Sequence, residues 1–409
     1  MKRVVIVASA ESYRTADFLG AARLLRLDVV VASDGISPIA GASRVHIELA
    51  DVERAAIEIA SIEPTPDAVV AIDDEGVLIA AAASQLLGIS CNPPSAVEAT
   101  RDKAIMRALL ARTGVRQPRF RLAGIGQIPD MAHALGFPVV IKPRTLSASR
   151  GVIRADDREG ARAAEERVRK ILAKAGKDPE SDLLVEQFIE GEEIAIEGLV
   201  SDGELEVLAV IDKPDPLDGP FFEETLFVTP SRHPAHVIEA SVGVVQQAVA
   251  ALGLVTGPVH AEVRLSETGP NLIEIASRTI GGLCGRALSF GLLGESLETV
   301  VLKAALGVST SDHEPTRPAS GVLMLPIPAT GVLSDVDGMT EALEVDGIDG
   351  VEVTVARGRR VTALPEGDRY LGFVFASGQD PEQVEDSLRA AAQVLSVTID
   401  GESMRPAVE

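Results

Sequence analysis

The sequence predicts a multidomain fold of the α/β and α+β classes, and three observations support this prediction. The chain has 409 residues, enough for about two to four domains. Apolar residues make up 46% and aromatic residues only 3%, which is typical of helices packed on sheets and not of a disordered chain. Strand and helix patterns alternate at the start of the chain, and shorter strands follow near its end.

Residues 1–95 are expected to form a domain built on an open parallel sheet. The continuous apolar run Val4–Ala8 is typical of a strand that is buried on both faces. Further elements alternate behind it: helices at Thr15–Leu27, Val52–Ile62 and Val77–Leu87, and strands at Asp28–Ala32 and Ala68–Ile72. This order predicts helices on both faces of the sheet. No G-x-G-x-x-G pattern follows the first strand, so the dinucleotide-binding fingerprint is missing.

Three further regions follow, at 96–199, 200–318 and 319–409. We expect the first to contain helices and strands at Ala99–Thr113, Phe137–Lys142, Arg158–Lys177, Leu183–Ile189 and Glu193–Val200. The charged helix of this set, which has no wide apolar face, is expected to be solvated. We expect the second to contain Leu205–Ile211, Pro234–Leu252, Val259–Leu265, Leu272–Ala276 and Ser296–Leu306. Short strands and turn residues beyond Ala319 predict a small α+β cap.

Composition and charge restrict the partners of this chain. Lys and Arg number 38 and Asp and Glu 61, which leaves a formal net charge of −23. Such a surface repels a polyphosphate backbone, so we expect no nucleic-acid partner. Two cysteines cannot form a disulfide framework, which favours a reducing, cytoplasmic location. The first apolar run is too short for a signal peptide, and no stretch approaches the ~18 apolar residues of a membrane span, so we expect no membrane association.

Two glutamates in the third region give the strongest local signal. The apolar runs Val259–Leu265 and Leu272–Ala276 flank a turn, so they should form a hairpin. With the turn centred near Thr268, Glu262 and Glu274 stand directly opposite each other on one face. Like charges placed in this way are destabilising unless a cation lies between them, and a carboxylate pair suits Mg²⁺. The alternative is a pair of solvated glutamates on an exposed hairpin face.

Basic residues at strand ends form a second group of candidates. Lys142 lies at the C-terminal end of a buried strand, where α/β sheets commonly bind ligands. The small residues of Thr145–Val152 would let backbone N–H groups approach phosphate oxygens, although this is not a P-loop. Arg278, just after the second hairpin strand, would stabilise negative charge next to a phosphate. The alternatives are an ordinary turn and a surface salt bridge.

Other patterns are weaker. Lys103 lies in a predicted helix and is by default a solvated lysine. The strand at 184–189 offers an extended backbone for an adenine edge, and Glu193 a carboxylate for ribose, but a strand edge with an acidic loop explains both. The six histidines show no zinc-ligand set, although His233 and His236 are three residues apart. No G-x-S-x-G elbow is present, and Cys284 has no neighbouring base.

Taken in order, these segments resemble an ATP-grasp enzyme. The resemblance spans roughly Lys103 to Arg278 and consists of a helix lysine, a strand lysine followed by proline, a small-residue loop, E-Q-F-I-E-G-E-E, H-A-E-V-R-L and I-E-I-A-S-R. Within that superfamily the chain is most similar to the L-amino acid ligases, which join two amino acids into a dipeptide. Gly219–Glu224, Thr229–Ser231 and the extension from about Ala319 carry this closer resemblance.

The resemblance implies an ATP-grasp fold in four parts. These are a pre-ATP-grasp domain at 1–95, a small subdomain with the ATP lid at 96–199, a large subdomain with the metal and substrate site at 200–318, and a ligase-type extension at 319–409.

The resemblance also implies a set of site residues, with Arg278 and Lys142 as the catalytic ones. ATP contacts are implied for Lys103, Lys142, Ser147, Ser149, Gly151, Glu186, Gln187, Ile189 and Glu193. In this set Glu186, with the backbone of Gln187 and Ile189, would bind adenine, and Glu193 would bind ribose. Mg²⁺, or alternatively Mn²⁺, would be held by Glu262 and Glu274. Substrate contacts are implied for Glu224, Phe227, His260, Arg278, Gly281 and Gly282.

Two positions depart from the family pattern. Ala276 stands where the familiar E-x-N-x-R ending has a metal-binding Asn, which puts the ligand shell of a second Mg²⁺ in doubt. Phe227 stands where these ligases often have a His, which favours a more apolar or differently charged substrate.

The activity that the resemblance implies is that of an ADP-forming ligase. A carboxylate would take the γ-phosphate of ATP, and an amine would then displace phosphate to form an amide, most simply a dipeptide. Its partners would be small carboxylates and amines, amino acids above all, and related enzymes are commonly homodimers. Three alternatives stay open: a carboxylase or purine-pathway ligase, a non-catalytic nucleotide-binding protein, and a nicotinamide-dependent dehydrogenase, although the last needs the missing glycine fingerprint.

Overall fold

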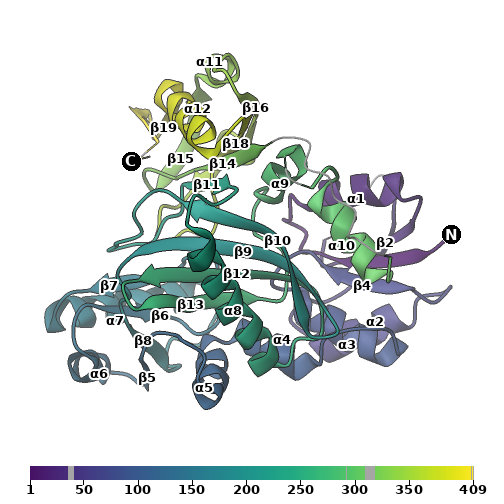
Figure 1. Cartoon of the computed structure of the whole chain (residues 1–409), viewed down its shortest axis with the longest axis horizontal. Helices are drawn as coiled ribbons and strands as arrows, with labels where there is room; N and C mark the ends of the chain where they lie inside the picture. The colour runs from purple at the N-terminus through teal and green to yellow at the C-terminus, as the bar shows by residue number, and fades with distance from the viewer. Residues whose placement is uncertain (36–40, 292, 309–317, 407, 409) are drawn as a thin grey trace.

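The computed structural model describes every residue of the chain except 36–40, 292, 309–317, 407 and 409. The described residues form four sheets. In Figure 1 the N-terminal sheet lies to the right of a large central sheet, a small sheet lies below and to its left, and the C-terminal part of the chain lies above it. This arrangement confirms the multidomain α/β and α+β prediction.

The N-terminal sheet is parallel throughout, as the alternating pattern predicts. Its strand order is β3 (Ser43–His46), β2 (Asp28–Ser33), β1 (Arg3–Val7), β4 (Ala68–Ala71). Helix α1 (Thr15–Leu24) covers one face, and α2 (Val52–Ala60) and α3 (Val77–Leu87) cover the other. The run of β1 is continuously apolar because Val4 and Ile6 enter one core while Val5 and Val7 enter the other. The edge strand β3 escapes prediction because it is short and partly exposed.

The small sheet is antiparallel and carries its helices on one face. Its strand order is β5 (Phe120–Ala123), β8 (Leu183–Gln187), β6 (Val139–Lys142), β7 (Ile153–Ala155). Helices α6 (Ile128–Leu135) and α7 (Arg158–Lys174) pack against it. The prediction of a solvated helix is wrong for α7, because Ala161, Ala164, Val168 and Leu172 form a buried stripe. Two of these four residues are alanines, so the stripe is weak in a hydropathy pattern.

The large sheet has eight antiparallel strands from three regions of the sequence. Their order is β13 (Gly269–Ala276), β12 (Thr256–Ser266), β9 (Glu192–Ser201), β10 (Glu204–Lys213), β11 (Leu226–Thr229), β14 (Ala319–Leu325), β18 (Gly372–Gly378), β16 (Ile348–Val353). The last three strands come from the predicted cap, so this part continues the central sheet and is not a separate unit. Strand β9 also belongs here, and not with the region 96–199 as the sequence grouping had it.

The predicted helix Ala99–Thr113 is in fact two helices, α4 (Pro94–Arg101) and α5 (Lys103–Thr113). Asp102 separates them with an extended backbone, and its side chain accepts hydrogen bonds from two N–H groups at the start of α5. Lys103 is therefore the first residue of a helix and not an interior one. Helix α5 packs on the core of the large sheet and not on the small sheet.

Helix α8 (Ala235–Leu252) covers one face of the large sheet. Val245, Ala248 and Val249 are buried there together with apolar residues of β9 and β12. By length and composition, it is the one helix of the described residues that could cross a membrane, and a third of it is buried inside the protein. A helix that covers a sheet with one apolar side meets the same criteria.

The other face of the large sheet joins the N-terminal sheet through a shared core. Helices α9 (Gly285–Gly291) and α10 (Leu297–Ala305) lie between the two sheets. Phe18 of α1, Leu302 of α10 and Phe373 of β18 belong to the same apolar cluster. This core fixes the carboxyl ends of β1 and β4 next to the large sheet.

The rest of the C-terminal region forms a second small sheet and two helices. The strand order is β17 (Arg360–Val361), β15 (Gly331–Asp337), β19 (Ser396–Ile399), β20 (Glu402–Met404). Helix α12 (Pro381–Val394) packs on β14 and β18, and α11 (Met339–Leu343) packs beside α12. The segment 362–371 connects β17 to β18.

Candidate active site

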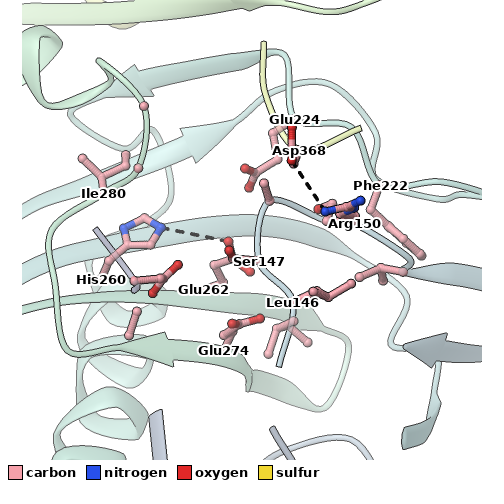
Figure 2. A pocket seen from close by; sticks show the side chains of 18 of the residues that line it. Leu146, Ser147, Arg150, Phe222, Glu224, His260, Glu262, Glu274, Ile280 and Asp368 are labelled. Carbon is pink, nitrogen blue, oxygen red and sulfur yellow. Dashed lines mark ion pairs between the residues drawn. The ribbon is translucent and has the colours of Figure 1, made fainter. Parts of the chain in front are cut away.

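A cavity of about 560 Å³ lies where the N-terminal, small and large sheets meet. Its wall contains residues that follow β1, β4 and β6, together with the hairpin β12–β13. The segment 368–370 from the C-terminal region borders it as well. Figure 2 shows His260, Glu262 and Glu274 on the large sheet, and Ser147 and Arg150 on a separate loop.

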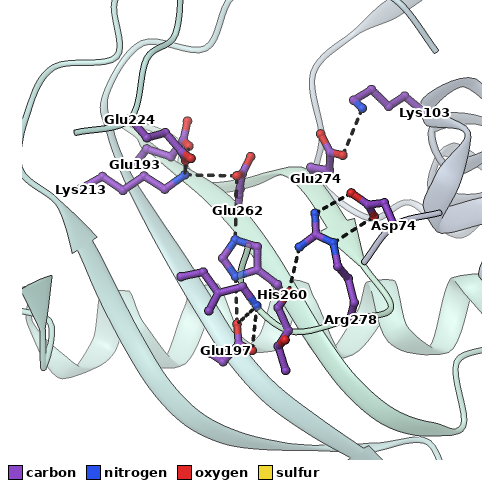
Figure 3. A network of polar contacts seen from close by, with 12 residues as sticks. Asp74, Lys103, Glu193, Glu197, Lys213, Glu224, His260, Glu262, Glu274 and Arg278 are labelled. Carbon is purple, nitrogen blue, oxygen red and sulfur yellow. Dashed lines mark hydrogen bonds and ion pairs between the residues drawn. The ribbon is translucent and has the colours of Figure 1, made fainter. Parts of the chain in front are cut away.

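The two hairpin glutamates stand opposite each other, as predicted. Glu262 of β12 pairs with Glu274 of β13, and both carboxylates lie on the same side of the ribbon (Figure 3). The turn closes on two residues, since Ser266 pairs with Gly269. A bulge of one residue next to Glu262 then shifts the register. The pairing expected from a turn centred at Thr268 is thus correct, but it is reached through this bulge.

Each of the two glutamates meets its own lysine. Glu274 lies 3.1 Å from the Nζ atom of Lys103, and Glu262 lies 3.3 Å from that of Lys213 (Figure 3). Burial raises the pKa of Glu262; Lys213 opposes this shift and the neighbouring glutamates reinforce it. Burial acts in the same direction on Glu274, but Lys103 and Lys142 outweigh it and lower the pKa. Glu274 is therefore the more firmly ionised carboxylate of the pair.

The donor chemistry of this pair fits Mg²⁺. Both side chains keep an exposed fraction, 24% for Glu262 and 29% for Glu274, so their oxygens can be reached from the cavity. Mg²⁺ prefers one or two carboxylates completed by water and substrate phosphates. Ala276, paired with His260 in the same hairpin, offers no side-chain ligand atom. The two glutamates can therefore hold one ion, and the side chain at position 276 adds no third oxygen.

A further carboxylate cluster surrounds Lys213. Oxygens of Glu193, Glu224 and Glu262 all lie within 4.8 Å of one another, which is metal-like spacing. The ammonium of Lys213 contacts all three, at 2.7 Å for Glu193, 3.3 Å for Glu262 and in a shorter contact for Glu224. Burial would lower the pKa of Lys213, but the three carboxylates raise it well above its ordinary value. The lysine itself thus supplies the positive charge that this cluster needs.

Lys142 is held in place by Glu186. Its Nζ atom lies 2.7 Å from the Glu186 carboxylate, which Arg107 also contacts at 2.5 Å, and all three side chains are buried. Burial would raise the pKa of Glu186, but Arg107 and Lys142 lower it to about 2. The Glu186 carboxylate therefore forms ion pairs with two cations, Arg107 and Lys142. Glu186, Gln187 and Ile189, the residues expected at adenine, all line the cavity.

Glu193, expected at a ribose, is buried between two cations. Lys213 contacts it on one side, and Nε of Arg264 donates to it at 3.0 Å on the other. These two charges lower the pKa of Glu193 against the effect of burial. Arg264 also donates to the carbonyl oxygen of Ile189 at 2.9 Å. A ribose hydroxyl would have to share this carboxylate with both cations.

The small-residue loop after β6 borders the cavity and contacts the C-terminal region. Ser147 and Ser149 line the cavity, whereas Gly151 does not belong to its wall. The N–H group of Gly151 donates instead to the carbonyl oxygen of Pro365 at 2.9 Å. Arg150 lies 3.5 Å from Asp368 (Figure 2). The N–H group of Gly151, which was expected to contact a phosphate, is thus bonded to Pro365 instead.

Arg278 is fixed by an aspartate from the N-terminal domain. Asp74, which follows β4, accepts two parallel hydrogen bonds from it, at 2.9 Å from Nε and 3.0 Å from Nη2 (Figure 3). The pKa of Arg278 is raised and that of Asp74 lowered by their mutual attraction, in both cases against burial. Arg101 contacts Asp74 as well, at 3.0 Å. A bidentate pair of this kind sets the orientation of the guanidinium.

The other expected substrate residues also gather at the cavity. Glu224, Phe227, His260, Gly281 and Gly282 all line it. A fully buried carboxylate, Glu197, contacts Nδ1 of His260 at 3.0 Å and accepts a hydrogen bond from the N–H of Ile280. This pair holds the imidazole with its other nitrogen 4.0 Å from Glu262.

Several residues that support the site were not predicted from the sequence: Asp74, Arg107, Glu197, Lys213 and Arg264. Each of them contacts a partner far along the chain, and no local pattern announces such a pairing. Arg107 and Glu186, for example, are separated by 79 positions. Only Lys213 has a local signal. Like Lys142, it is the last residue of a largely apolar strand and is followed directly by a proline.

Two protein families and a solved structure match the chain. The ATP-grasp domain matches residues 135–287, and the L-amino acid ligase C-terminal domain 2 matches residues 323–400. The crystal structure of L-amino acid ligase from Bacillus licheniformis superimposes with a TM-score of 0.82 at 26% sequence identity. The match covers 98% of this chain and 99% of that one.

Curated relatives match shorter parts of the chain. The uncharacterized protein y4rH of Sinorhizobium fredii is 28% identical over 315 residues, 75% of this chain and 63% of the relative. Alanine–anticapsin ligase of Bacillus subtilis is 31% identical over 219 residues, 49% of this chain and 46% of the relative. The chain thus spans less than two thirds of the length of either relative.

Proposed function

Because the chain belongs to the ATP-grasp superfamily and carries a C-terminal domain of the L-amino acid ligases, we propose that it joins a carboxylic acid to an amine with cleavage of ATP. We call the acid the donor substrate and the amine the acceptor substrate. Both are amino acids in the simplest case, and the product is then a dipeptide. ADP and inorganic phosphate are the other products.

The reaction requires an activated carboxylate, because a free carboxylate is a poor electrophile toward an amine. Transfer of the γ-phosphoryl group of ATP to a donor carboxylate oxygen gives an acyl-phosphate and ADP. The acceptor nitrogen then attacks the acyl carbon, the C–N bond forms, and the C–O bond to phosphate breaks. The nitrogen loses a proton in this step, and phosphate leaves with the electron pair.

The charges around the cavity suit these steps. The positive charges of Lys103 and Lys142 both lower the pKa of Glu274, and these two lysines would face the phosphates of ATP. Mg²⁺ held by Glu262 and Glu274 would neutralise phosphate charge as well. Arg278, oriented by Asp74, would stabilise the oxyanion that develops on the donor acyl group. Catalysis would rest mainly on positioning and on charge neutralisation.

The loop Thr145–Val152, most of which lines the cavity, would keep water from the acyl-phosphate, which would otherwise hydrolyse. Two further contacts connect this side of the cavity to the C-terminal region. Arg150 meets Asp368, and Arg167 of α7 forms a bidentate pair with Glu366 at 2.7 and 2.9 Å. We therefore propose that the C-terminal extension helps to hold the loop at the edge of the cavity.

The observation that carries the proposal is the meeting of Lys103, Lys142 and Arg278 with the two hairpin glutamates at one cavity. The test is an ADP-release screen over all pairs of the common L-amino acids, followed by mass spectrometry. We expect ADP and phosphate together with a product whose mass is that of both substrates minus water. Formation of AMP and pyrophosphate would exclude the acyl-phosphate route, and a bicarbonate-derived product would indicate a carboxylase instead.

Ala276 favours a second candidate, a protein that binds the nucleotide without turnover. Its methyl group leaves no side-chain oxygen ligand two positions after Glu274. Such a protein would show a higher unfolding temperature with MgATP but would release no ADP with any acceptor. The same screen therefore separates the two candidates.

We also propose a homodimer that works in the cytoplasm and accepts Mn²⁺ in place of Mg²⁺. The cysteine-poor sequence supports the cytoplasmic location, and the dimer and Mn²⁺ are what the resemblance to the ligases implies. Light scattering after size-exclusion chromatography tests the dimer, and ADP release with each metal tests the cation.

A further inference from the structure

We infer that Arg14 binds the carboxylate group that stays free on the acceptor substrate, so that the acceptor is an amino acid and not a simple amine. This inference rests on the proposed function, because it concerns the substrate of the same cavity. Neither the sequence patterns nor the resemblance assigned a role to this residue.

Arg14 lies at the end of the cavity that the N-terminal domain forms. It directly precedes α1 and belongs to the cavity wall, together with its neighbours Ser12 and Tyr13. The side chain is buried, with the residue only 5% exposed. A buried guanidinium at a cavity wall is a position that normally requires an anionic partner.

The partners of Arg14 are neutral. Nη1 donates to the carbonyl oxygen of Ile72, and Nη2 donates to the hydroxyl of Thr279. Within the described part of the chain, no carboxylate lies within the 4.0 Å of an ion pair with it. Of the acidic residues on adjoining helices, Asp17 pairs with Arg286, and burial raises the pKa of Glu298 despite the opposing charge of Arg14.

This lack of an acidic partner distinguishes Arg14 from the rest of the wall. Every other arginine that lines the cavity forms an ion pair: Arg101 and Arg278 with Asp74, Arg150 with Asp368, Arg264 with Glu193, and Arg369 with Glu11. The cavity therefore contains one buried guanidinium whose charge the described residues leave uncompensated. An anionic ligand would compensate it.

Arg14 also keeps hydrogen-bonding capacity for such a ligand. A guanidinium has five N–H donors, and the two bonds to Ile72 and Thr279 use two of them. The remaining donors suit a carboxylate, which guanidinium groups bind with two parallel hydrogen bonds. Helix α1 begins without a capping side chain, so the positive end of its dipole adds to the attraction.

The position of Arg14 relative to Arg278 identifies which carboxylate it would bind. The hydroxyl of Thr279 accepts from Arg14, and the carbonyl oxygen of the same residue accepts from Nη1 of Arg278 at 2.9 Å. The two guanidinium groups thus flank a single residue. In an α-amino acid only one carbon separates the amine from the carboxylate. An amine that attacks beside Arg278 can therefore reach Arg14 with its own carboxylate.

The test compares acceptors with and without this charge. The screen first selects the most active acceptor among the common L-amino acids, and kcat/KM is then measured for this acid and for its α-amide. In the wild type we expect the acid to be preferred. Arg14→Gln should lower kcat/KM for the acid by roughly 10- to 150-fold, the range for a charged hydrogen bond, mainly through KM. The amide should change by less than about threefold, and the KM for MgATP should stay constant.

Two further variants complete the design. Arg14→Lys keeps the charge without the planar fork, so the acid should recover part of its preference. Arg3→Gln, which removes an arginine that pairs with Asp28 away from the cavity, should keep the full preference. If Arg14→Gln does not fold, Arg14→Lys serves alone, and a lower acid-to-amide ratio is then the expected result.

The outcomes that overturn the inference differ from those that overturn the proposed function. An equal loss with acid and amide, or no loss at all, excludes Arg14 as the acceptor anchor while amide synthesis stands. An equal loss accompanied by a higher KM for the donor substrate would assign Arg14 to the donor carboxylate instead. A wild type that forms no amide with any acceptor removes the proposed function itself.

Discussion

At the scale of single residues, the cavity is built from paired opposite charges. Lys103 faces Glu274, Lys142 faces Glu186, and Arg278 faces Asp74. Burying such groups is costly for each alone, and the pairing offsets that cost. A nucleotide with Mg²⁺ would bring both negative and positive charge into this network, so the existing pairs can exchange partners without leaving a charge unmatched.

The first prediction concerns Glu274, one of the two proposed metal ligands. Glu274→Gln should lower amine-dependent ADP release by at least about a hundredfold, because the amide is neutral and binds Mg²⁺ weakly. The matched control is Glu267→Gln, at the exposed turn of the same hairpin, which should keep full activity. A coupled assay for ADP measures both variants. Full activity of Glu274→Gln would contradict the assigned site.

The second prediction concerns the pH dependence of stability at Glu223. Burial raises the pKa of this carboxyl from 4.5 to about 7. Since the folded-state pKa is the higher one, its contribution to stability is full below about pH 4.5 and is lost as the pH rises through about 7. Glu223→Gln should therefore gain about 1–3 kcal/mol over the wild type across this window, a range reduced for partial exposure.

Urea unfolding at a series of pH values measures this difference. Glu206→Gln, which removes a carboxylate at an exposed position, is the matched control. If the free energy of unfolding of Glu223→Gln differed from that of the wild type by the same amount at all pH values, the pKa of this carboxyl would not be raised by folding.

Single residues also show what sequence reasoning can reach. Glu262 and Glu274 were predictable as a pair because a hairpin connects them locally and side chains alternate with a period of two. Asp74 and Arg278 lie 204 positions apart, and their pairing depends on how the N-terminal sheet docks on the large one. No local pattern encodes that docking, so the orientation of Arg278 was not predictable.

At the scale of elements, the break between α4 and α5 places Lys103 at the start of a helix, where it contacts the loop after β6. Asp102 caps α5 and also pairs with Arg144, which follows β6. The N–H group of Lys103 donates to the carbonyl oxygen of Arg144 at 3.0 Å, and its Nζ atom donates to that of Leu146 at 2.7 Å. The start of this helix is thus fastened to the loop that borders the cavity.

The third prediction tests this helix start. Asp102→Ala removes the cap and the partner of Arg144, so it should lower the free energy of unfolding by about 1–2 kcal/mol. The KM for ATP should rise, because Lys103 and the loop after β6 lose their common anchor. Asp102→Asn keeps a capping oxygen and should retain most of the stability. Unchanged KM in the alanine variant would separate the helix start from nucleotide binding.

Helices and strands were predicted best where each hydrophobic pattern corresponds to a single helix or strand. The alternation in residues 1–95 gave the parallel sheet correctly. The break at Asp102 was missed because the apolar spacing continues across it, and only the cap distinguishes two helices from one. The buried stripe of α7 was missed because alanine contributes little to the pattern.

At the scale of the whole molecule, the C-terminal region is part of the central sheet. Strand β11 pairs along its full length with β14, from Leu226 with Leu323 to Thr229 with Ser320. Leu226 and Val228 enter a core made mostly of C-terminal residues. The region also borders the cavity through the segment 368–370. The large sheet beside the cavity and the C-terminal region are therefore one structural unit.

The fourth prediction follows from this continuity. A chain ending at residue 318 would expose the edge of β11 and the apolar residues of that core, so it should aggregate and show no activity. A chain ending at residue 400 loses the edge strand β20 and the short segment after it but keeps the buried residues of that core, so it should stay folded. Size-exclusion chromatography and thermal unfolding measure both. A monodisperse, cooperatively folded 1–318 chain would contradict the proposed continuity.

The sequence predicted the fold class but not this connection between the C-terminal region and the central sheet. Short strands with turns are compatible both with a separate cap and with strands added to an existing sheet. Which of the two forms depends on long-range strand pairing, and local hydropathy does not report such pairing.

The most direct test of the account is to locate the divalent ion. Crystals grown with ADP and Mn²⁺ allow the metal to be placed by anomalous scattering. The account predicts a peak within coordination distance of carboxylate oxygens of both Glu262 and Glu274, and its loss in Glu274→Gln. A peak confined to the cluster around Lys213, or bound ADP with no metal between the two hairpin glutamates, would contradict it.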